Sequence, residues 1–421
     1  MTRFVWGIAV FMAVLATVTS VDACSNLSVV MADGAIVIAR TMELEGLTHN
    51  HEQFPFTLET FKRNTEFSGA SSCEGTTLPS NSLGFAAITN HIPFMNPVSS
   101  EGMNESGFTI SLQLFTIATY QTSSGNAGKT PICYMDVVMW ALGQFSTVAQ
   151  LVAALTNDVY VVKGKRPSSG NYGHWIAQDA TGANVVIEYI NGQLAVHDNS
   201  QVGVVTNQPS YEWHVTNLDN YIALASSADA KLLKNMQAIV PDLGTFPSNQ
   251  GHGFNTIGLP GDSSPASRFV RLFYLKGLAL ANGGVPKTLT SAIQMASALI
   301  NTVFIPTGSA TPPSVLGGYD STQWTVIKIP STKEFLFRTY ANNQWRRIQL
   351  ADLDFTQSQT YALYNTGDGI LDVSPLPKQQ SPTLTNSTAE DDSSPSTLEI
   401  TSSHTHRGPP VIPGNGAFRS L

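Results

Sequence analysis

Residues 24–43 read CSNLSVVMADGAIVIARTME and contain two apolar, β-rich runs, Leu27–Met31 and Ala35–Arg40. The dipeptide Asp33-Gly34 between the runs is a strong signal for a two-residue β-hairpin turn. This stretch therefore predicts an antiparallel hairpin at the start of the folded domain, with Cys24 at the open end of its first strand.

The predicted hairpin determines which residues face each other. With Asp33 and Gly34 as the turn, Cys24 lies opposite Glu43 and Leu27 lies opposite Arg40. Cross-strand neighbours are about 5 Å apart, so Glu43 is within reach of an ammonium group on Cys24. Arg40 falls on the other face of an ideal strand. A bulge or a strand end would be needed to bring it to the thiol.

Residues 1–23 are predicted to be a secretory signal peptide. Arg3 supplies a positive n-region, residues 4–18 are apolar, and the segment ends in the small residue Ala23. The apolar stretch is shorter than the roughly 20 residues that span a bilayer. Cleavage after Ala23 would place Cys24 at the amino terminus of an exported protein. A cysteine in that position is a lipid anchor, half of a disulfide, or an amino-terminal nucleophile.

The overall composition narrows the class of protein. The chain has 421 residues, with 22 basic and 30 acidic side chains and a net charge of −8, which leaves no basic footprint for nucleic acid or anionic membrane. Hydrophobic residues make up 42% of the chain, enough for a large core, so disorder of the whole chain is excluded. Cys73 and Cys133 are either a disulfide or buried thiols.

The remaining pattern is mixed. Residues 378–421 are rich in Ser, Thr and Pro and are predicted to be a disordered tail, which leaves residues 24–377 as one domain. Ser146 is expected to cap a helix, Pro265 to open another through about Leu280, and residues 289–303 to form a third. Further strands are expected at residues 175–178, 183–189, 193–197, 323–330, 334–340 and 344–350. Blocks of strands separated by pairs of helices favour a layered α+β fold over a doubly wound sheet.

Five motifs follow one another in a fixed order along the chain. They are CSNLS at 24–28, ARTME at 39–43, GMNE at 102–105, GVVTNQPSYEWH at 203–214 and GLPGDSSPASRF at 258–269. Together they resemble the choloylglycine hydrolase and penicillin V acylase family of linear amide C–N hydrolases. The resemblance implies a four-layer αββα sandwich of the amino-terminal nucleophile type, in a family whose members are often homo-tetramers. No His-Glu-x-x-His arrangement, Gly-x-Ser-x-Gly elbow or phosphate-binding loop occurs in the sequence, so no cofactor or metal ion is expected.

The resemblance also assigns catalytic roles. Cys24 is the nucleophile, and its own α-amine is the base, because an α-amine titrates near 7.7 to 8.0 and can accept the thiol proton at neutral pH. Arg40 lies beside the thiol and favours the thiolate. Glu43 takes the place of an aspartate that holds the α-amine, with one extra methylene group. Asn207 donates its side-chain amide to the oxyanion, and Arg268 is a second active-site arginine.

Further assignments concern the substrate. The backbone N–H of Leu114 is the expected second oxyanion donor, at a position where relatives carry Asn or Tyr. Met42, Phe94 and Phe115 are expected to line the substrate pocket, and His214 is given a structural role.

The sequence thus predicts an exported cysteine amidohydrolase that passes through a thioester intermediate. Its substrate would be a small-molecule amide that joins an apolar acyl group to a small amine, as in penicillin V or a conjugated bile salt. Two alternatives are an N-acyl homoserine lactone acylase and a non-catalytic, lipidated surface-binding member of the family. The former would also join an apolar acyl group to a small amine, whereas the latter would carry a blocked Cys24.

Overall fold

The computed structural model describes residues 23–45, 55–71, 73–91, 95–164, 172–222, 224, 256–310, 319–364 and 369. Phe94, nearly all of the predicted signal peptide and the whole of the predicted tail at 378–421 lie outside these residues. The boundary at 377 and the tail therefore stay predictions. Within the described part of the chain, no helix has the length and apolarity needed to cross a bilayer.

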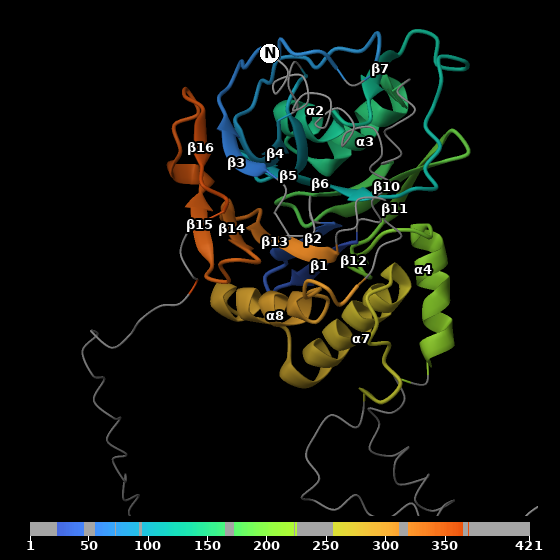
Figure 1. The fold of residues 1–421 in the computed structure, drawn as a ribbon, viewed down its shortest axis with the longest axis vertical. Helices are drawn as coiled ribbons and strands as arrows, with labels where there is room; N and C mark the ends of the chain where they lie inside the picture. The colour runs from blue at the N-terminus through green and yellow to red at the C-terminus, as the bar shows by residue number, and fades with distance from the viewer. Residues whose placement is uncertain are drawn as a thin grey trace, which may run out of the picture. The chain divides into compact units, whose positions relative to one another are not determined.

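Two antiparallel sheets form the centre of the fold (Figure 1). The six-stranded sheet has the order β12 (Val204–Val205), β1 (Cys24–Val30), β2 (Ile36–Glu45), β13 (Asp320–Ile329), β14 (Glu334–Thr339) and β15 (Arg346–Gln349). The eight-stranded sheet has the order β11 (Gln193–Asp198), β10 (Asn184–Ile190), β9 (Gly173–Gln178), β6 (Thr109–Leu114), β5 (Val98–Asn104), β4 (Phe85–Asn90), β3 (Phe56–Phe61) and β16 (Gln359–Tyr361). A small parallel pair joins β7 (Thr130–Cys133) to β8 (Val159–Val162).

Helices cover the outer faces of both sheets (Figure 1). The helices α2 (Val137–Gln144) and α3 (Val148–Asn157) lie over the eight-stranded sheet. The helices α7 (Pro265–Gly283) and α8 (Leu289–Asn301) lie over the six-stranded sheet, with α4 (Tyr211–Asn217) beside α7 and followed by the 3-10 turn η1 (Leu218–Tyr221). A second 3-10 turn, η3 (Leu350–Asp352), follows β15. The expected four-layer αββα sandwich is confirmed.

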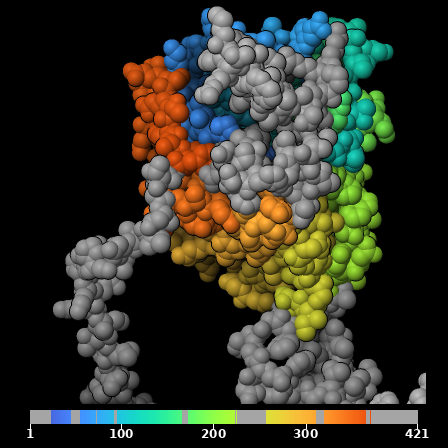
Figure 2. Space-filling view, in the orientation of Figure 1, coloured from blue at the N-terminus to red at the C-terminus, as the bar shows by residue number. Residues whose placement is uncertain are grey.

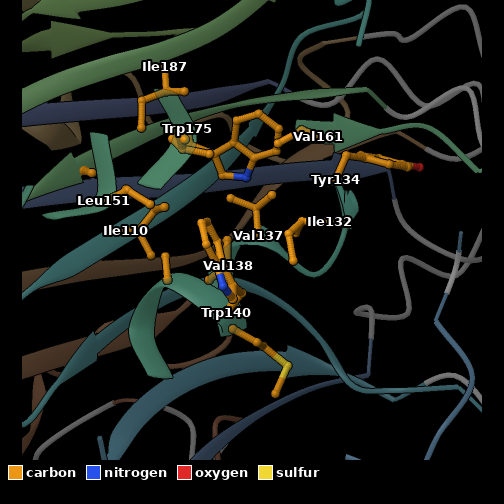
Figure 3. Close-up of a cluster of buried hydrophobic side chains, with 14 of the residues drawn as sticks. Ile110, Ile132, Tyr134, Val137, Val138, Trp140, Leu151, Val161, Trp175 and Ile187 are labelled. Carbon is orange, nitrogen blue, oxygen red and sulfur yellow. The ribbon is translucent and has the colours of Figure 1, made fainter. Parts of the chain in front are cut away.

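Apolar side chains hold each helical layer to its sheet. On the α2 side, buried residues from the helices pack against the outer face of the eight-stranded sheet (Figure 3). The side chains labelled there include Val138 and Trp140 of α2, Ile110 of β6 and Trp175 of β9. On the other side, Leu27, Val29, Val37 and Ala39 pack in one cluster with residues of α7 and α8.

The space between the two sheets is different, because many of its side chains are polar. Asn26 accepts a hydrogen bond from Gln178 at 3.3 Å, and Ser28 accepts one from Asn184 at 3.0 Å. Both pairs join β1 to the eight-stranded sheet. Buried polar groups need partners, so this layer specifies how the two sheets face each other.

A strand from the C-terminal part of the described chain closes one edge of the eight-stranded sheet beside a strand from its N-terminal part. Strand β16 pairs with β3 although 299 residues separate Thr60 from Gln359. Figure 2 shows the orange C-terminal strands beside the blue N-terminal region on one face.

The first hairpin differs from its prediction by one residue. Cys24 pairs with Met42 and Asn26 pairs with Arg40, rather than Cys24 with Glu43. The loop has three residues, 32–34, because Met31 donates its backbone N–H to the carbonyl of Ala35 and Gly34 adopts a φ of +86°. A three-residue loop that ends in a left-handed glycine is the next most common hairpin connection after the two-residue turn.

The helix starts agree more closely with the sequence. Pro265 is the first residue of α7, capped by Ser264 as expected, although the helix continues to Gly283. The cap of α3 is Thr147 rather than Ser146, because Thr147 and Gln150 form a reciprocal capping box.

A disulfide joins Cys73 to Cys133, which decides between the two interpretations of these cysteines. It closes a loop with a sequence separation of 60 residues between the segment before β4 and the end of β7. Cys24 takes no part in it.

We expect Cys73→Ser, Cys133→Ser and the double variant to lose the same stability, about 2–4 kcal/mol, because each removes one loop constraint from the unfolded chain. Urea unfolding of the oxidised proteins measures this. Additive losses in the double variant would contradict a bond between these two residues.

Candidate active site

Cys24 is the first residue of β1 and is 1% exposed. Its side chain shares the inter-sheet face with those of its cross-strand partner Met42 and of Arg40, since alternate residues of a strand share a face. The Sγ atom lies 3.5 Å from Met42 Sδ and 3.8 Å from Arg40 Nη2. The three-residue loop therefore brings arginine and thiol together without a bulge, which corrects the expectation that Arg40 lies on the other face.

Buried groups contact both terminal nitrogens and one face of the Arg40 guanidinium. Its Nη2 donates to the carbonyl of Leu112 at 2.5 Å, and its Nη1 lies 3.3 Å from Glu101 Oε2. Its guanidinium carbon lies 4.8 Å from the centre of the Trp324 ring. These contacts leave the guanidinium little freedom to move away from the sulfur.

Glu101 and Lys328 belong to the same buried network, and the sequence analysis missed both. Lys328 Nζ pairs with Glu101 Oε1 and lies 3.1 Å from Ser111 Oγ, which itself donates to Glu101 Oε2 at 2.8 Å. Burial lowers the pKa of Lys328, and the Glu101 charge partly opposes that effect. The sequence does carry a signal for this pair, which is a lysine inside the apolar strand WTVIKI. A lysine buried in such a strand needs an oppositely charged partner, so it predicts a buried carboxylate nearby.

The side chain of Asn207 bridges Cys24 and Leu114. Its Oδ1 accepts from the backbone N–H of Cys24 at 2.7 Å, and its Nδ2 donates to the carbonyl of Leu114 at 2.9 Å. The carbonyl of Asn207 lies 2.9 Å from Nε2 of His214. Burial lowers the pKa of His214 to about 4, so the ring is neutral at pH 7 and donates from Nε2. His214 thus has the structural role expected of it.

The backbone N–H of Leu114 points toward the same side as the Asn207 amide. Leu114 lies opposite Gly173 in the sheet, but the two residues are not hydrogen-bonded to each other. The N–H of Gly173 donates to the Tyr120 hydroxyl at 2.8 Å, and the Gly173 carbonyl accepts from the same hydroxyl at 2.8 Å. The next residue, Phe115, donates to Tyr172 at 2.7 Å. Bonded and non-bonded pairs alternate along an antiparallel ladder, so both backbone groups of Leu114 face away from β9.

Arg268 reaches the start of β1 from the first turns of α7. Its Nη1 donates to the carbonyl of Cys24 at 2.6 Å and to Ser25 Oγ at 2.5 Å. Its Nη2 donates to Asn207 Oδ1 at 2.8 Å. Arg268 therefore positions Cys24 and Asn207 relative to each other, on the opposite side from Arg40.

Glu43 lies on the face of β2 opposite to Cys24 Sγ, because it follows Met42 by one residue. Its carboxylate accepts from Thr322 Oγ1 at 2.8 Å, and its backbone N–H donates to the carbonyl of Ala23 at 3.0 Å. Burial raises the pKa of Glu43 to about 7, although the Arg268 charge and hydrogen bonds from Thr41 and Thr322 oppose the rise.

A cavity of about 150 Å³ lies beside the thiol. It is lined by Cys24, Met42, Ser100, Leu112, Gln113, Leu114, Tyr134, Met135, Tyr172 and Gly173. Met42 is where it was expected. Phe115 is not among the lining residues: it is fully buried in the largest hydrophobic cluster, and its ring centre lies 4.7 Å from that of His174, on which it stacks. Phe94 lies outside the described residues. In the described part of the chain, no group of three His, Cys, Asp or Glu side chains could hold a metal ion.

Comparison with known proteins places this arrangement among amide hydrolases. The profile of the linear amide C–N hydrolases, choloylglycine hydrolase family, matches residues 24–364. A bile salt hydrolase/transferase of Clostridium perfringens is 28% identical over 349 residues, which cover 82% of this chain and 98% of the relative.

Solved structures agree with the fold. A variant of the conjugated bile acid hydrolase from Clostridium perfringens is 25% identical with a TM-score of 0.65, over 83% of this chain and all (100%) of the other. The penicillin V acylase from Agrobacterium tumefaciens is 20% identical with a TM-score of 0.57, over 80% of this chain and 90% of the other.

We expect Glu101→Gln to destabilise the protein by about 3–5 kcal/mol, because it leaves Arg40 and Lys328 buried without their carboxylate. Adding Lys328→Met should restore part of that loss, because only one cation then remains. Urea unfolding of the single and double variants measures the coupling. Losses that simply add would show that the two side chains do not stabilise each other.

The raised pKa of Glu43 predicts a pH-dependent stability. Between its ordinary value of 4.5 and about 7, the folded chain holds a proton that the unfolded chain has lost. Stability should therefore fall as the pH rises through this window, by up to about 3 kcal/mol from this group. In protein that retains Ala23, Glu43→Gln should flatten the slope between pH 5 and pH 8 in urea unfolding. The exposed Glu66→Gln serves as the control, and an equal slope in the Glu43 variant would contradict the assignment.

Proposed function

Because this chain belongs to the choloylglycine hydrolase family of linear amide C–N hydrolases, we propose that it cleaves linear amides with Cys24 as an amino-terminal nucleophile. One observation supports this function most. The sulfur of Cys24 lies 3.8 Å from a buried arginine, while its nitrogen lies 2.7 Å from the side-chain oxygen of Asn207. The proposed nucleophile and base both belong to Cys24, and the side chains of Arg40 and Asn207 contact them.

Release of the nitrogen is the activating step in this mechanism. While Ala23 is present, the nitrogen of Cys24 is an amide and cannot accept a proton. Removal of residues 1–23 converts it to an α-amine that titrates near 7.7 to 8.0. We place this removal at export, as the predicted signal peptide implies, so the mature enzyme would be secreted or periplasmic. Asn207 Oδ1 already accepts from this nitrogen at 2.7 Å, and we assign it, together with the family role of Glu43, to hold the new ammonium group.

Acylation then begins at the sulfur. The α-amine takes the thiol proton, directly or through water, and the positive charge of Arg40 favours the thiolate. The thiolate attacks the carbonyl carbon of the amide, and the carbonyl oxygen becomes an oxyanion. We assign stabilisation of this oxyanion to the Leu114 N–H and the second N–H of Asn207 Nδ2, and one such donor contributes about 3 kcal/mol of transition-state stabilisation.

Collapse of the tetrahedral intermediate breaks the C–N bond. The amine leaves with the proton held by the α-ammonium, and the acyl group remains as a thioester on Cys24. Water then attacks the thioester with the same α-amine as base, which releases the carboxylic acid and restores the thiol. Atoms and protons balance without any further reagent.

The cavity supports a substrate with an apolar acyl group and a small amine. Met42, Leu112, Leu114 and Met135 supply an apolar lining beside the sulfur. Penicillin V and conjugated bile salts are the substrates we propose, with N-acyl homoserine lactones as the alternative. Burial of Cys24 at 1% exposure argues against the lipidated, non-catalytic alternative, because an acyl chain on its sulfur would displace packed side chains.

We expect Cys24→Ser to reduce turnover at least a thousandfold, because a hydroxyl is a far weaker nucleophile than a thiolate. Release of the amine from penicillin V, glycine-conjugated bile salts and acyl homoserine lactones is the measurement, with mass spectrometry of the Cys24 peptide to detect the thioester. The Cys73→Ser, Cys133→Ser double variant is the thiol control and should keep its activity below its unfolding temperature. Equal loss in both, or full activity in a protein that retains Ala23, would contradict the mechanism.

A further inference from the structure

We propose that Glu188 and His174 are positioning residues for the two assigned oxyanion donors. One buried carboxylate supports both the segment that carries Asn207 and the strand end that carries Leu114. This role rests on the proposed function, because it takes those two residues as the groups that stabilise the oxyanion. Neither Glu188 nor His174 lines the cavity beside Cys24, so both act through other residues.

Glu188 lies at the centre of a buried polar cluster. It is 0% exposed, and its side chain leaves β10 on the face that Asn184 shares, toward β1. Its Oε1 lies 3.1 Å from His174 Nδ1 and accepts the backbone N–H of Tyr211 at 3.0 Å. Its Oε2 lies 3.7 Å from His197 Nε2. The cluster thus joins β9, β10 and β11 to the start of α4.

The carboxylate keeps its charge in this position. Burial by itself would raise the pKa of Glu188, but hydrogen bonds from His174 and His197 lower it to about 2, and the N–H of Tyr211 acts in the same direction. An ionised carboxylate only accepts hydrogen bonds. His174 therefore carries a proton on Nδ1 and donates it to Glu188.

The first contact of this carboxylate supports Asn207. Tyr211 is the first residue of α4, and its N–H has no partner inside the helix. Ser210 already caps this helix, so Glu188 is not needed for α4 to form. Its contact instead fixes where the helix begins relative to β10. Because His214 of the same helix contacts the carbonyl of Asn207, a shift of α4 would move Asn207 as well.

The second contact supports the strand end that carries Leu114. The rings of His174 and Phe115 stack, with their centres 4.7 Å apart and their planes at 2°. Phe115 directly follows Leu114, and its N–H donates to the carbonyl of Tyr172 at 2.7 Å. The hydrogen bond to Glu188 fixes the rotation of the His174 ring. The face on which Phe115 packs is therefore fixed too.

Both oxyanion donors must be placed accurately relative to the sulfur. Asn207 Nδ2 donates to the carbonyl of Leu114 at 2.9 Å, so a displacement of one residue also moves the other. The two residues come from different parts of the chain, and Glu188 contacts the supports of both. A displacement of about 1 Å at a positioned group lowers a rate by about a hundredfold. Loss of the carboxylate should therefore slow oxyanion formation and leave the thiol unaffected.

Glu188→Ala tests this role. The substrate is the amide that the wild type hydrolyses fastest among penicillin V, glycine-conjugated bile salts and acyl homoserine lactones. We expect kcat to fall about a hundredfold with KM within about threefold of the wild type, because the oxyanion forms only after the substrate is bound. Alkylation of Cys24 by iodoacetamide should keep its wild-type rate, because displacement of iodide builds no oxyanion. A general loss of structure would change both rates.

Two further variants separate geometry from stability. In Glu188→Gln the amide oxygen has two lone pairs that accept from both His174 and Tyr211, so kcat should stay within about fivefold of the wild type. Asp179→Ala is the matched control. Asp179 is a buried carboxylate that accepts the N–H of Val148, the first residue of α3, at 2.7 Å. That helix carries no residue of the proposed site, so this variant should lose stability and keep its kcat.

The outcomes that would overturn the role are definite. An unchanged kcat in Glu188→Ala would refute it, and so would equal losses of kcat in Glu188→Ala and Asp179→Ala. If Glu188→Ala does not fold, His174→Ala takes its place, because it removes only the second contact. We expect that variant to lose about tenfold in kcat, which is the effect of one hydrogen bond, and an unchanged kcat there would refute the role.

A spectroscopic measurement separates this role from the proposed function. In protein with isotopically labelled asparagine, the side-chain amide signals of Asn207, identified by their loss in Asn207→Ala, report its contact with Leu114 whether or not an amide is hydrolysed. They should shift in Glu188→Ala and stay in place in Asp179→Ala. A shift without hydrolysis by the wild type would refute the proposed function and retain the positioning role. Hydrolysis by the wild type, with unchanged kcat and unchanged signals in Glu188→Ala, would retain the function and refute the role.

Discussion

The register between β1 and β2 is the constraint on which the site depends. Cys24 pairs with Met42, so its side chain faces the eight-stranded sheet together with Arg40. The N–H of Cys24 points away from β2 and meets Asn207, which follows the short strand on the other side of β1. A slip of one residue would turn the thiol toward α7 and α8 and leave Arg40 on the opposite face. One three-residue loop, closed by a glycine with positive φ, therefore determines the geometry around the sulfur.

The strand register sets the face on which Arg40 lies, and the charged groups around its guanidinium fix the position of the side chain. The buried ion network around Arg40 consists of two cations, Arg40 and Lys328, and one anion, Glu101, all fully buried. Such a group is expensive to desolvate, and an apolar replacement would often be as stable. Its net positive charge beside the sulfur gives a reason for it, since a cation favours the thiolate. Arg268 approaches from α7, and it donates hydrogen bonds to both the Cys24 carbonyl and the Asn207 side-chain oxygen. The two arginines approach the same residue from opposite layers of the sandwich.

Local rules succeeded where a structure depends on neighbouring residues. The start of α7 at Pro265 and the strands predicted at 175–178 and 334–340 follow from capping and alternation, and the structure has strands at Gly173–Gln178 and Glu334–Thr339. The same rules missed by one residue at Asp33-Gly34 and at Ser146, because a turn signal does not specify loop length and two adjacent residues can both act as caps. Phe115 was misplaced because whether an aromatic residue lines a cavity or packs in the core depends on the side chains that surround it, here His174 of another strand.

By itself, the sequence determined the α+β class, the first hairpin, the three helices that begin near residues 147, 265 and 289 and several strands after residue 172. It also identified Cys24, Arg40, Asn207 and Arg268 as residues of one family pattern, since motifs and periodicities are local in the chain. Only the tertiary structure decided which face each residue occupies, that Glu101 and Lys328 surround Arg40, that Cys73 is bonded to Cys133, and that Glu188 contacts both His174 and Tyr211. The physical reason is distance along the chain. Glu101 and Lys328 are 227 residues apart, and their pairing depends on two sheets packing face to face, which no local preference encodes.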